Sequence, residues 1–247
     1  MIKNYFFNGN TKVVDGVTLK QIECEEYGVG GWIENESNLA QEGECWVSDD
    51  AMVYGNAKVS GNVKMYNNAV VSKNAKVDGN VLLDGNARVS GNAYTSDYAH
   101  ITGNAVIFGC AVIFGDSVVS GNAIVYGNAT VYGKAKVSGD VEIYGDARVY
   151  GSAKVFENAQ VYGNSQVYSF AQVFGDAKVY GNAKIGNGAK ILDEAEVYGD
   201  AQVCRKAMVY GKARVYDYVK VSDNAKVGGN VNVCGYKVVC GDTIMDD

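Results

Sequence analysis

The chain of 247 residues contains no proline, one histidine and no long run of basic residues. A formal net charge of −6 and the lack of clustered Lys and Arg argue against strong non-specific nucleic-acid binding. No window has the apolar length of a membrane span, and the first residues lack the apolar core of a signal peptide. We therefore expect a cytoplasmic protein with no membrane segment.

Cysteine is sparse as well, and no two of the six cysteines have CxxC spacing. Neither a disulfide framework nor a zinc knuckle is indicated, so reduced thiols are expected. One histidine per chain is too few for a three-histidine metal site, unless a three-fold axis gathers three copies of it. We predict no metal site.

What the chain has in abundance is a six-residue repeat, which runs from Val47 through 33 consecutive hexads without insertion or deletion. The first position is Val, Ile or Leu except at Met65 and Thr95, and the fifth is Ala, Val or Ser except at Lys237 and Thr243. Gly with Asn or Asp commonly fills the third and fourth positions, where these residues tolerate the positive φ of a turn. Side chains alternate between the turns, so each hexad predicts a short strand with its aliphatic and small residues on one side.

Three hexads make an 18-residue triangular coil, and the repeat provides about eleven of them over residues 47–244. Each strand is expected to pair with its equivalent in the next coil, because one coil cannot bury its own apolar face. The prediction is an all-β fold, a single-stranded parallel β-helix followed by an acidic tail at residues 245–247. We expect coil regularity to fail near Lys237, where a lysine takes an interior position.

Residues 1–46 depart from the repeat. The stretch "KVVDGVTLKQIECEE" predicts two short strands around an Asp-Gly turn, which is a β-hairpin signal. The following residues carry both tryptophans, Trp32 and Trp46, to the start of the repeat. We interpret residues 1–46 as an N-terminal cap over the open interior and strand edge of the first coil.

An aliphatic position followed four residues later by a small one resembles the hexapeptide-repeat family. The resemblance implies a left-handed parallel β-helix, and the handedness is expected on this ground alone, since general crossover rules favour right-handed connections. Together with the lead-in segment, the repeat looks like a group of uncharacterised YdcK-like proteins of bacteria and phages, often described as transferases because of their fold. A label taken from the fold leaves the chemistry open.

Residues 18 apart fall on the same face of the coils, and one such row is aromatic. The row begins at Phe108 and continues as Tyr126, Tyr144, Tyr162, Tyr180, Tyr198 and Tyr216. Aromatic residues suit strands and stack on their equals, which is one explanation of the row. The other is a flat ligand-binding or partner-binding surface for a sugar, a nucleotide or a protein. The basic residues assigned to the same face are Lys58, Lys76, Arg148, Lys184 and Lys220.

A second unusual feature is an apolar belt around one coil. Its outward positions are Val106, Phe108, Val112, Phe114, Val118 and Ile124. Exposed apolar patches of this kind mark contacts. Either the N-terminal segment covers part of the belt, or the belt is an oligomer interface. We expect a homo-oligomer, and the resemblance to hexapeptide-repeat enzymes favours a trimer.

The enzyme hypothesis depends on His100, because hexapeptide-repeat acyltransferases use a histidine as general base toward an acceptor and bind an acyl-CoA donor. His100 lies where the repeat deviates most. If subunits meet there, it is expected in an intersubunit cleft, with Asp97 or Asp116 to orient it. The alternative is a solvated surface histidine in a degenerate repeat.

The functional expectation is a rigid β-helical scaffold for a partner or ligand, without catalysis on the repeat faces and without a cofactor. Because similar proteins occur in phages, the expectation includes a phage-related role. The alternative is an acyl-CoA-dependent O- or N-acyltransferase of the hexapeptide-repeat type, with His100 and Asp97 as the catalytic residues.

Overall fold

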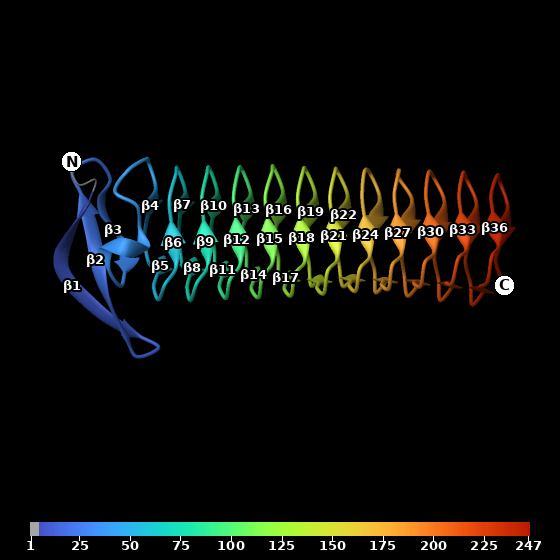
Figure 1. Cartoon of the computed structure of the whole chain (residues 1–247), viewed down its shortest axis with the longest axis horizontal. Coiled ribbons are helices and arrows are strands. Elements are labelled where there is room, and N and C mark those ends of the chain that lie inside the picture. Colours follow the sequence, from blue (N-terminus) through green and yellow to red (C-terminus); the bar gives the residue numbers. More distant parts are fainter. Residues whose placement is uncertain (1–4) are drawn as a thin grey trace. The chain divides into compact units, whose positions relative to one another are not determined.

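The computed structural model describes residues 5–247, so the first four residues of the predicted cap lie outside it. The described residues form parallel β-solenoid coils with an antiparallel hairpin before them, and the one helix among them is the short 3-10 helix η1 (Glu36–Asn38) (Figure 1). They fall into two compact units, Met1–Gly121 and Asn122–Asp247. The all-β prediction is confirmed.

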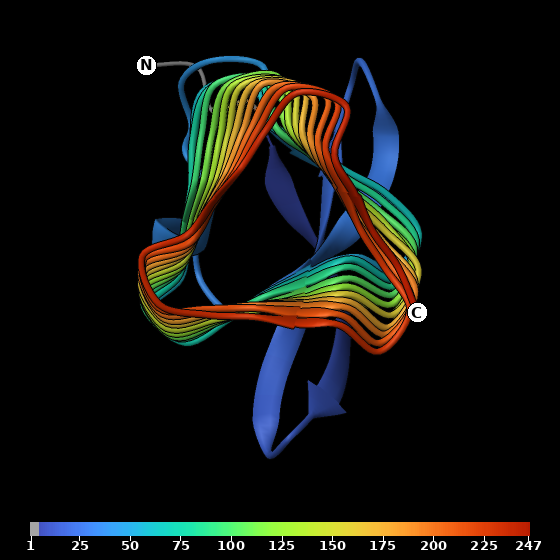
Figure 2. The ribbon, with the colours of Figure 1, turned by 90° about the vertical axis from the view of Figure 1, so that its right-hand side faces the viewer.

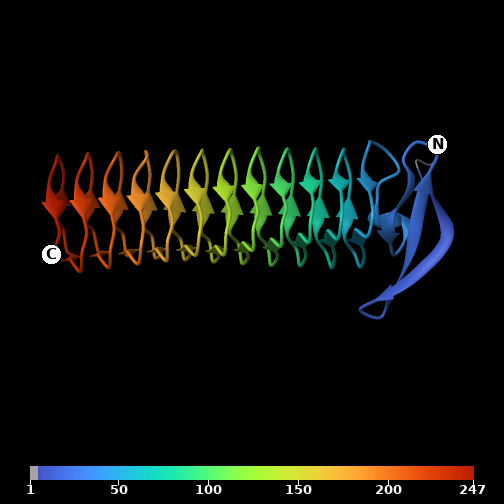
Figure 3. The ribbon, with the colours of Figure 1, turned by 180° about the vertical axis from the view of Figure 1, so that it is seen from behind.

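The predicted hairpin is present in the first unit. Strands β1 (Phe6–Val14) and β2 (Val17–Cys24) pair in antiparallel fashion around Asp15 and Gly16, which have φ of 51° and 77°. Positive φ at both central residues suits the right-handed twist of a two-residue hairpin. Strand β2 also pairs with β3 (Gly28–Ile33), and the tip of the hairpin extends beyond the first coils (Figure 3).

The segment before Val47 also supplies a coil that the hexad pattern does not reveal. Ile33 of β3 pairs with Val53, Leu39 forms a bridge to Val59, and Val47 of β4 pairs with Met65. The inward residues of this coil are therefore Ile33, Leu39 and Val47, all of them buried. The step from Leu39 to Val47 is longer than a hexad, which hides the coil from a six-residue reading.

The first unit contains three sheets, and neighbouring strands in each are paired. The first sheet runs through β1, β2, β3, β5 (Met52–Val53), β8 (Val70–Val71), β11 (Arg88–Val89) and β14 (Val106–Ile107). The second consists of β6 (Lys58–Val59), β9 (Lys76–Val77), β12 (Tyr94–Thr95) and β15 (Val112–Ile113). The third consists of β4 (Trp46–Val47), β7 (Lys64–Met65), β10 (Leu82–Leu83), β13 (His100–Ile101) and β16 (Val118–Val119).

The second unit repeats the same plan with seven strands in each of three parallel sheets. The first sheet contains β17 (Ile124–Val125), β20 (Glu142–Ile143), β23 (Gln160–Val161), β26 (Lys178–Val179), β29 (Glu196–Val197), β32 (Arg214–Val215) and β35 (Asn232–Val233). The second contains β18 (Thr130–Val131), β21 (Arg148–Val149), β24 (Gln166–Val167), β27 (Lys184–Ile185), β30 (Gln202–Val203), β33 (Lys220–Val221) and β36 (Val238–Val239). The third contains β19 (Lys136–Val137), β22 (Lys154–Val155), β25 (Gln172–Val173), β28 (Lys190–Ile191), β31 (Met208–Val209), β34 (Lys226–Val227) and β37 (Ile244–Met245).

Each coil has three sides, as the end-on view shows (Figure 2). The aliphatic and small positions of the hexad point inward: Val161 and Ala159, for example, are completely buried. Backbone hydrogen bonds join each coil to the next, such as the one that the Tyr162 N–H donates to the carbonyl oxygen of Val179 at 2.9 Å. Strands of two residues are stable here because every coil lends its neighbour both apolar contact and hydrogen bonds.

The turns between strands use a residue with positive φ. At Gly127, with φ of 71°, an added Cβ would lie 3.0 Å from the backbone nitrogen of Gly145 in the next coil. Where an acidic residue replaces this glycine, its carboxylate accepts a hydrogen bond from the next coil: Glu157 accepts from the Gly175 N–H at 2.8 Å. A departure from the consensus therefore adds an inter-coil contact.

Asparagine side chains form hydrogen-bonded rows along the corners. In one row, the Asn164 amide donates to Asn182 at 3.1 Å, and the Asn182 amide donates to Asp200 at 3.0 Å. The donors in these rows belong to the earlier coil and the acceptors to the later one. Such rows satisfy the polar groups that the turns expose along the solenoid.

The coils stay regular to the C-terminal end, so the predicted irregularity near Lys237 is wrong. Strand β36 pairs with β33, and β37 pairs with β34. Lys237 is exposed and its backbone oxygen accepts a hydrogen bond from Lys220 at 2.9 Å. Because Lys237 is exposed, its ammonium group does not carry the cost of burial that an interior position would impose. The left-handed winding stays a prediction.

Candidate functional site

The longest described aromatic row lies beside the first sheet of the second unit. Each of its residues directly follows a strand of that sheet and is half-buried. The rings are stacked and nearly parallel, with centroids 4.7–4.9 Å apart and interplanar angles of 1–12°. We call this row the tyrosine ladder; it comprises Tyr126, Tyr144, Tyr162, Tyr180, Tyr198 and Tyr216. The predicted alignment of these tyrosines is confirmed.

Stacking decides what the ladder can offer to a ligand. Each of the four inner rings has a parallel neighbour on both sides, so its two faces are covered by protein. A sugar or nucleobase that binds by stacking needs an open ring face. The inner rings leave only their edges and hydroxyl groups to solvent, which suits partners that approach the row from the side.

Charged groups adjoin the ladder and fix one of its hydroxyls. The Tyr180 hydroxyl donates a hydrogen bond to Glu196 Oε2 at 3.0 Å, and Arg214 Nη2 lies 3.7 Å from Glu196 Oε1. The basic residues expected on this face instead lie on strands of the second sheet: Lys58 and Lys76 on β6 and β9 of the first unit, and Arg148, Lys184 and Lys220 on β21, β27 and β33 of the second unit. That assignment is wrong, because each tyrosine follows its strand and a corner separates it from the next strand.

The ladder hydroxyls stay protonated at neutral pH. Burial raises the pKa of Tyr144, Tyr162 and Tyr198 above the ordinary tyrosine value. The pKa of Tyr180 is raised by burial and further by its hydrogen bond to Glu196. Even an unperturbed tyrosine has a pKa of about 10. At neutral pH the ladder therefore presents neutral hydroxyl groups that can donate hydrogen bonds.

Other aromatic stacks occur on the remaining sides of the second unit. Tyr132, Tyr150 and Tyr168 stack with centroids 4.9 and 5.4 Å apart, and Phe156 stacks on Phe174 at 4.7 Å. Stacking is therefore a general way in which these coils pack like residues, and it stabilises neighbouring coils. The tyrosine ladder differs from these other stacks in its length.

The two candidate catalytic residues, His100 and Asp97, are not hydrogen-bonded to each other. His100 lies on β13 between Leu82 and Val118, and its Nε2 atom is buried without a hydrogen-bond partner. Asp97 is exposed, with φ of 60°, and its Oδ2 accepts a hydrogen bond from the Gly115 N–H at 3.0 Å. Asp97 thus occupies the same turn position as Glu157 and bonds the next coil rather than the histidine.

The belt residues of the first unit lie at outward positions on or next to β14, β15 and β16. Val106, Val112 and Val118 are half-buried, and Phe108 is 37% exposed. The N-terminal segment does not cover them, because strands β1–β3 lie at the opposite edge of the first sheet from β14. Coverage of the belt by the N-terminal segment is therefore not seen, and the oligomer interface stays a prediction.

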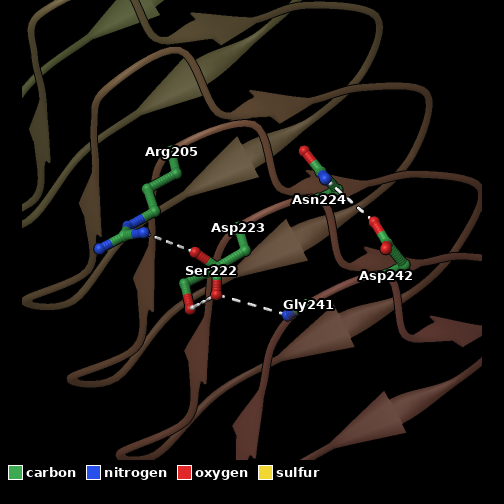
Figure 4. Close-up of polar contacts among 6 residues, drawn as sticks. All are labelled: Arg205, Ser222, Asp223, Asn224, Gly241 and Asp242. Carbon is green, nitrogen blue, oxygen red and sulfur yellow. Dashed lines mark hydrogen bonds and ion pairs between the residues drawn. The ribbon is translucent and has the colours of Figure 1, made fainter.

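A small surface cavity of about 240 Å³ lies at a corner near the C-terminal end of the second unit. Arg205 Nη1 lies 2.7 Å from Asp223 Oδ1, and Asp223 Oδ2 also accepts from the Gly241 N–H (Figure 4). Both charged side chains are substantially exposed, so this ion pair contributes little to stability. The Asp223 carboxylate therefore bonds the next coil, as those of Glu157 and Asp97 do.

Within residues 5–247, no group of three or more His, Cys, Asp and Glu side chains is arranged to hold a metal ion. The six cysteines are free thiols. In the same part of the chain, no helix has the length and apolar character needed to cross a membrane.

Comparison with known families identifies the kind of repeat. Residues 118–133, 125–139 and 143–157 match the family model described as YdcK beta solenoid repeat. These segments are similar to the YdcK β-solenoid repeat. The matched YdcK-type segments include Tyr126, Tyr132, Tyr144 and Tyr150, so they overlap two of the aromatic stacks. No curated protein matches the chain.

Proposed function

We propose that the protein is a rigid scaffold that binds a protein partner along the edge of the tyrosine ladder, without catalysis on the repeat faces. The observation that supports this proposal is the parallel stacking of the ladder at 4.7–4.9 Å. It closes the inner ring faces to a sugar or nucleobase, while the ring edges and hydroxyls form an ordered amphipathic row. Tyrosine is enriched at protein interfaces for this combination of apolar ring and hydroxyl.

The ordering of the row also favours binding thermodynamically. Rings that are already held in one orientation by their neighbours lose little side-chain entropy when a partner covers them. The Tyr180 hydroxyl is further held by Glu196 at 3.0 Å. A preorganised surface of this kind retains more of its contact energy as affinity than a flexible one does.

Native mass spectrometry of protein purified from its host tests the proposal, because it reports subunit number and any retained partner together. We compare the natural chain with a Tyr162→Ser/Tyr180→Ser variant of the ladder. The matched control is Tyr150→Ser/Tyr168→Ser, which changes two tyrosines of the shorter stack that begins at Tyr132. The partner signal should be lost in the first variant and retained in the control. Equal retention in both variants would remove the ladder from the proposal.

The same experiment includes a His100→Ala variant. If CoA is retained by the natural chain and lost in the His100→Ala variant, the acyltransferase hypothesis replaces the scaffold proposal. The subunit number tests the predicted trimer, and a Phe108→Ser/Val118→Ser variant tests whether the belt holds copies together. A monomer in the natural protein would contradict the proposed oligomer interface while leaving the ladder proposal standing.

A further inference from the structure

A cavity lies in the N-terminal cap. Its volume is about 410 Å³, which is within the range of small-ligand sites. It is lined by Tyr5, Phe6, Cys24, Glu25, Glu26, Tyr27, Gly43, Glu44, Cys45 and Trp46. The residues come from β1, β2, β4 and the loops between them, so the fold of the cap creates the cavity.

Aromatic rings form a fixed wall of this cavity. The rings of Tyr27 and Trp46 have centroids 5.3 Å apart with an interplanar angle of 37°. Trp46 is buried, and an added Cβ at Gly30 would lie 2.7 Å from its ring, so the glycine makes room for the indole. Unlike the inner ladder rings, Tyr27 is tilted against its neighbour and is 45% exposed.

The charged groups that line the cavity are all acidic. Glu25, Glu26 and Glu44 are exposed at its surface, and the lining contains no Lys or Arg. Cys24 Sγ accepts a hydrogen bond from the Tyr27 N–H at 3.1 Å. Burial raises the pKa of Cys45, which keeps that thiol neutral. An aromatic wall with carboxylates around it favours a cation.

A neighbouring side chain shows that this wall accepts a cation. Lys64 Nζ lies 4.8 Å from the centroid of the Tyr27 ring and donates a hydrogen bond to the Glu44 carbonyl oxygen at 2.6 Å. Similar contacts occur elsewhere in the cap, where Lys12 lies over Trp32 and Lys20 over Phe7. One lysine leaves the three lining carboxylates with a net negative charge.

We infer that the cap cavity binds an organic cation with an apolar stem, namely an alkylammonium group. The stem packs against Tyr27 and Trp46, and the ammonium group interacts with the ring faces and with Glu25, Glu26 and Glu44. The group can belong to a free amine or to a lysine side chain of a polypeptide, since both present the same chemistry. This inference is independent of the tyrosine ladder.

Fluorescence of Trp46 tests the inference in a full-length Trp32→Phe background, where Trp46 is the one remaining tryptophan. The probes are n-butylammonium, its neutral counterpart n-butanol, and the blocked peptide acetyl-Gly-Lys-Gly-amide. We expect saturable binding of n-butylammonium and none of n-butanol. Binding of the peptide as well assigns the site to lysine side chains, whereas binding of n-butylammonium alone assigns it to free amines.

Charge-removing variants provide the control. Glu25→Gln/Glu26→Gln/Glu44→Gln should weaken n-butylammonium binding at least about tenfold, whereas Glu42→Gln, an exposed neighbour outside the lining, should change it less than about twofold. The single variant Glu26→Gln gives the same test if the triple variant folds poorly. No saturable binding to the natural lining, equal binding of n-butanol, or equal weakening by Glu42→Gln would each overturn the inference.

Discussion

The cap and the coils of the second unit use aromatic residues in opposite ways. In the coils, identical rings recur every 18 residues and stack, so the faces of the inner ladder rings are covered by their own neighbours. In the cap, rings of different kinds meet at larger angles, as Tyr27 and Trp46 do at 37°, and lysine ammonium groups lie over three rings. Repetition thus yields an ordered surface of edges and hydroxyls, whereas the irregular sequence of the cap brings ring faces into contact with cations.

The largest expected effect tests the dependence of a coil on its neighbours. Val161→Asp places a carboxylate in the dry interior of the second unit, where Val161 is completely buried. We expect a loss of at least about 4 kcal/mol in the free energy of unfolding. Urea unfolding followed by circular dichroism measures it. The control Gln160→Asp, outward on the same strand, should stay within about 0.5 kcal/mol, and similar midpoints for both would contradict the assigned interior.

In the cap, Trp46→Ala should be the next most damaging change. Trp46 is 6% exposed and packs against Gly30 and Tyr27. Deleting a buried indole costs about 3–5 kcal/mol, and partial exposure and collapse of the site favour the lower end. Thermal unfolding of this variant is compared with Val13→Ala, a change at a residue that is 69% exposed. If the two variants melt together, Trp46 is not part of the packed cap.

A smaller effect on stability tests whether Asp97 is a structural turn residue rather than a catalytic one. Because Asp97 has φ of 60° and bonds the Gly115 N–H, Asp97→Ala should lower the free energy of unfolding by about 1 kcal/mol. Asp97→Gly should cost less, since glycine accepts positive φ without strain. Chemical denaturation measures both changes. Equal stability of the natural chain and the Asp97→Ala variant would contradict the structural role.

The smallest effect concerns alkaline pH. Burial raises the pKa of the ladder tyrosines in the folded state, so the unfolded state loses its phenolic protons first. The contribution is fully present below about pH 10 and is lost as the pH rises above that value. The melting temperature should therefore fall above about pH 10, and less steeply in Tyr162→Phe/Tyr180→Phe. The tyrosines are half-buried and their hydroxyls lie near solvent, so the difference is small. Identical pH profiles of the two proteins would contradict the prediction.

The sequence predicts the coils well because their determinants are local and repeated. The inward residues, the turn glycines and the 18-residue alignment of the tyrosines all follow from the hexad. The hairpin follows from Asp15 and Gly16 for the same reason, since two residues with positive φ are enough to define the turn.

What the sequence does not reveal depends on contacts between distant segments. The coil of Ile33, Leu39 and Val47 is hidden by one longer step, although its residues pair with the next coil like any other. The cap cavity brings together residues from β1, β2 and β4 that share no pattern. In the sequence, Asp97 is a deviation from the repeat next to His100. The structure shows that its partner is the Gly115 N–H of the next coil. Ring stacking likewise depends on side-chain orientation, which hexad spacing does not specify.

The hydrogen bonds of the asparagine rows bear on whether single coils could be removed or exchanged. In the row Asn164, Asn182 and Asp200, each amide donates toward the later coil, and the aspartate can only accept. Deleting the coil that carries Asn182 would still place a donor against an acceptor. Reversing the order of the last two coils would place the aspartate before the asparagine, an arrangement that this row already contains, because Asp146 precedes Asn164. The direction of a row can therefore end at an aspartate and begin again at the next asparagine, so the corners tolerate both the removal and the exchange of single coils.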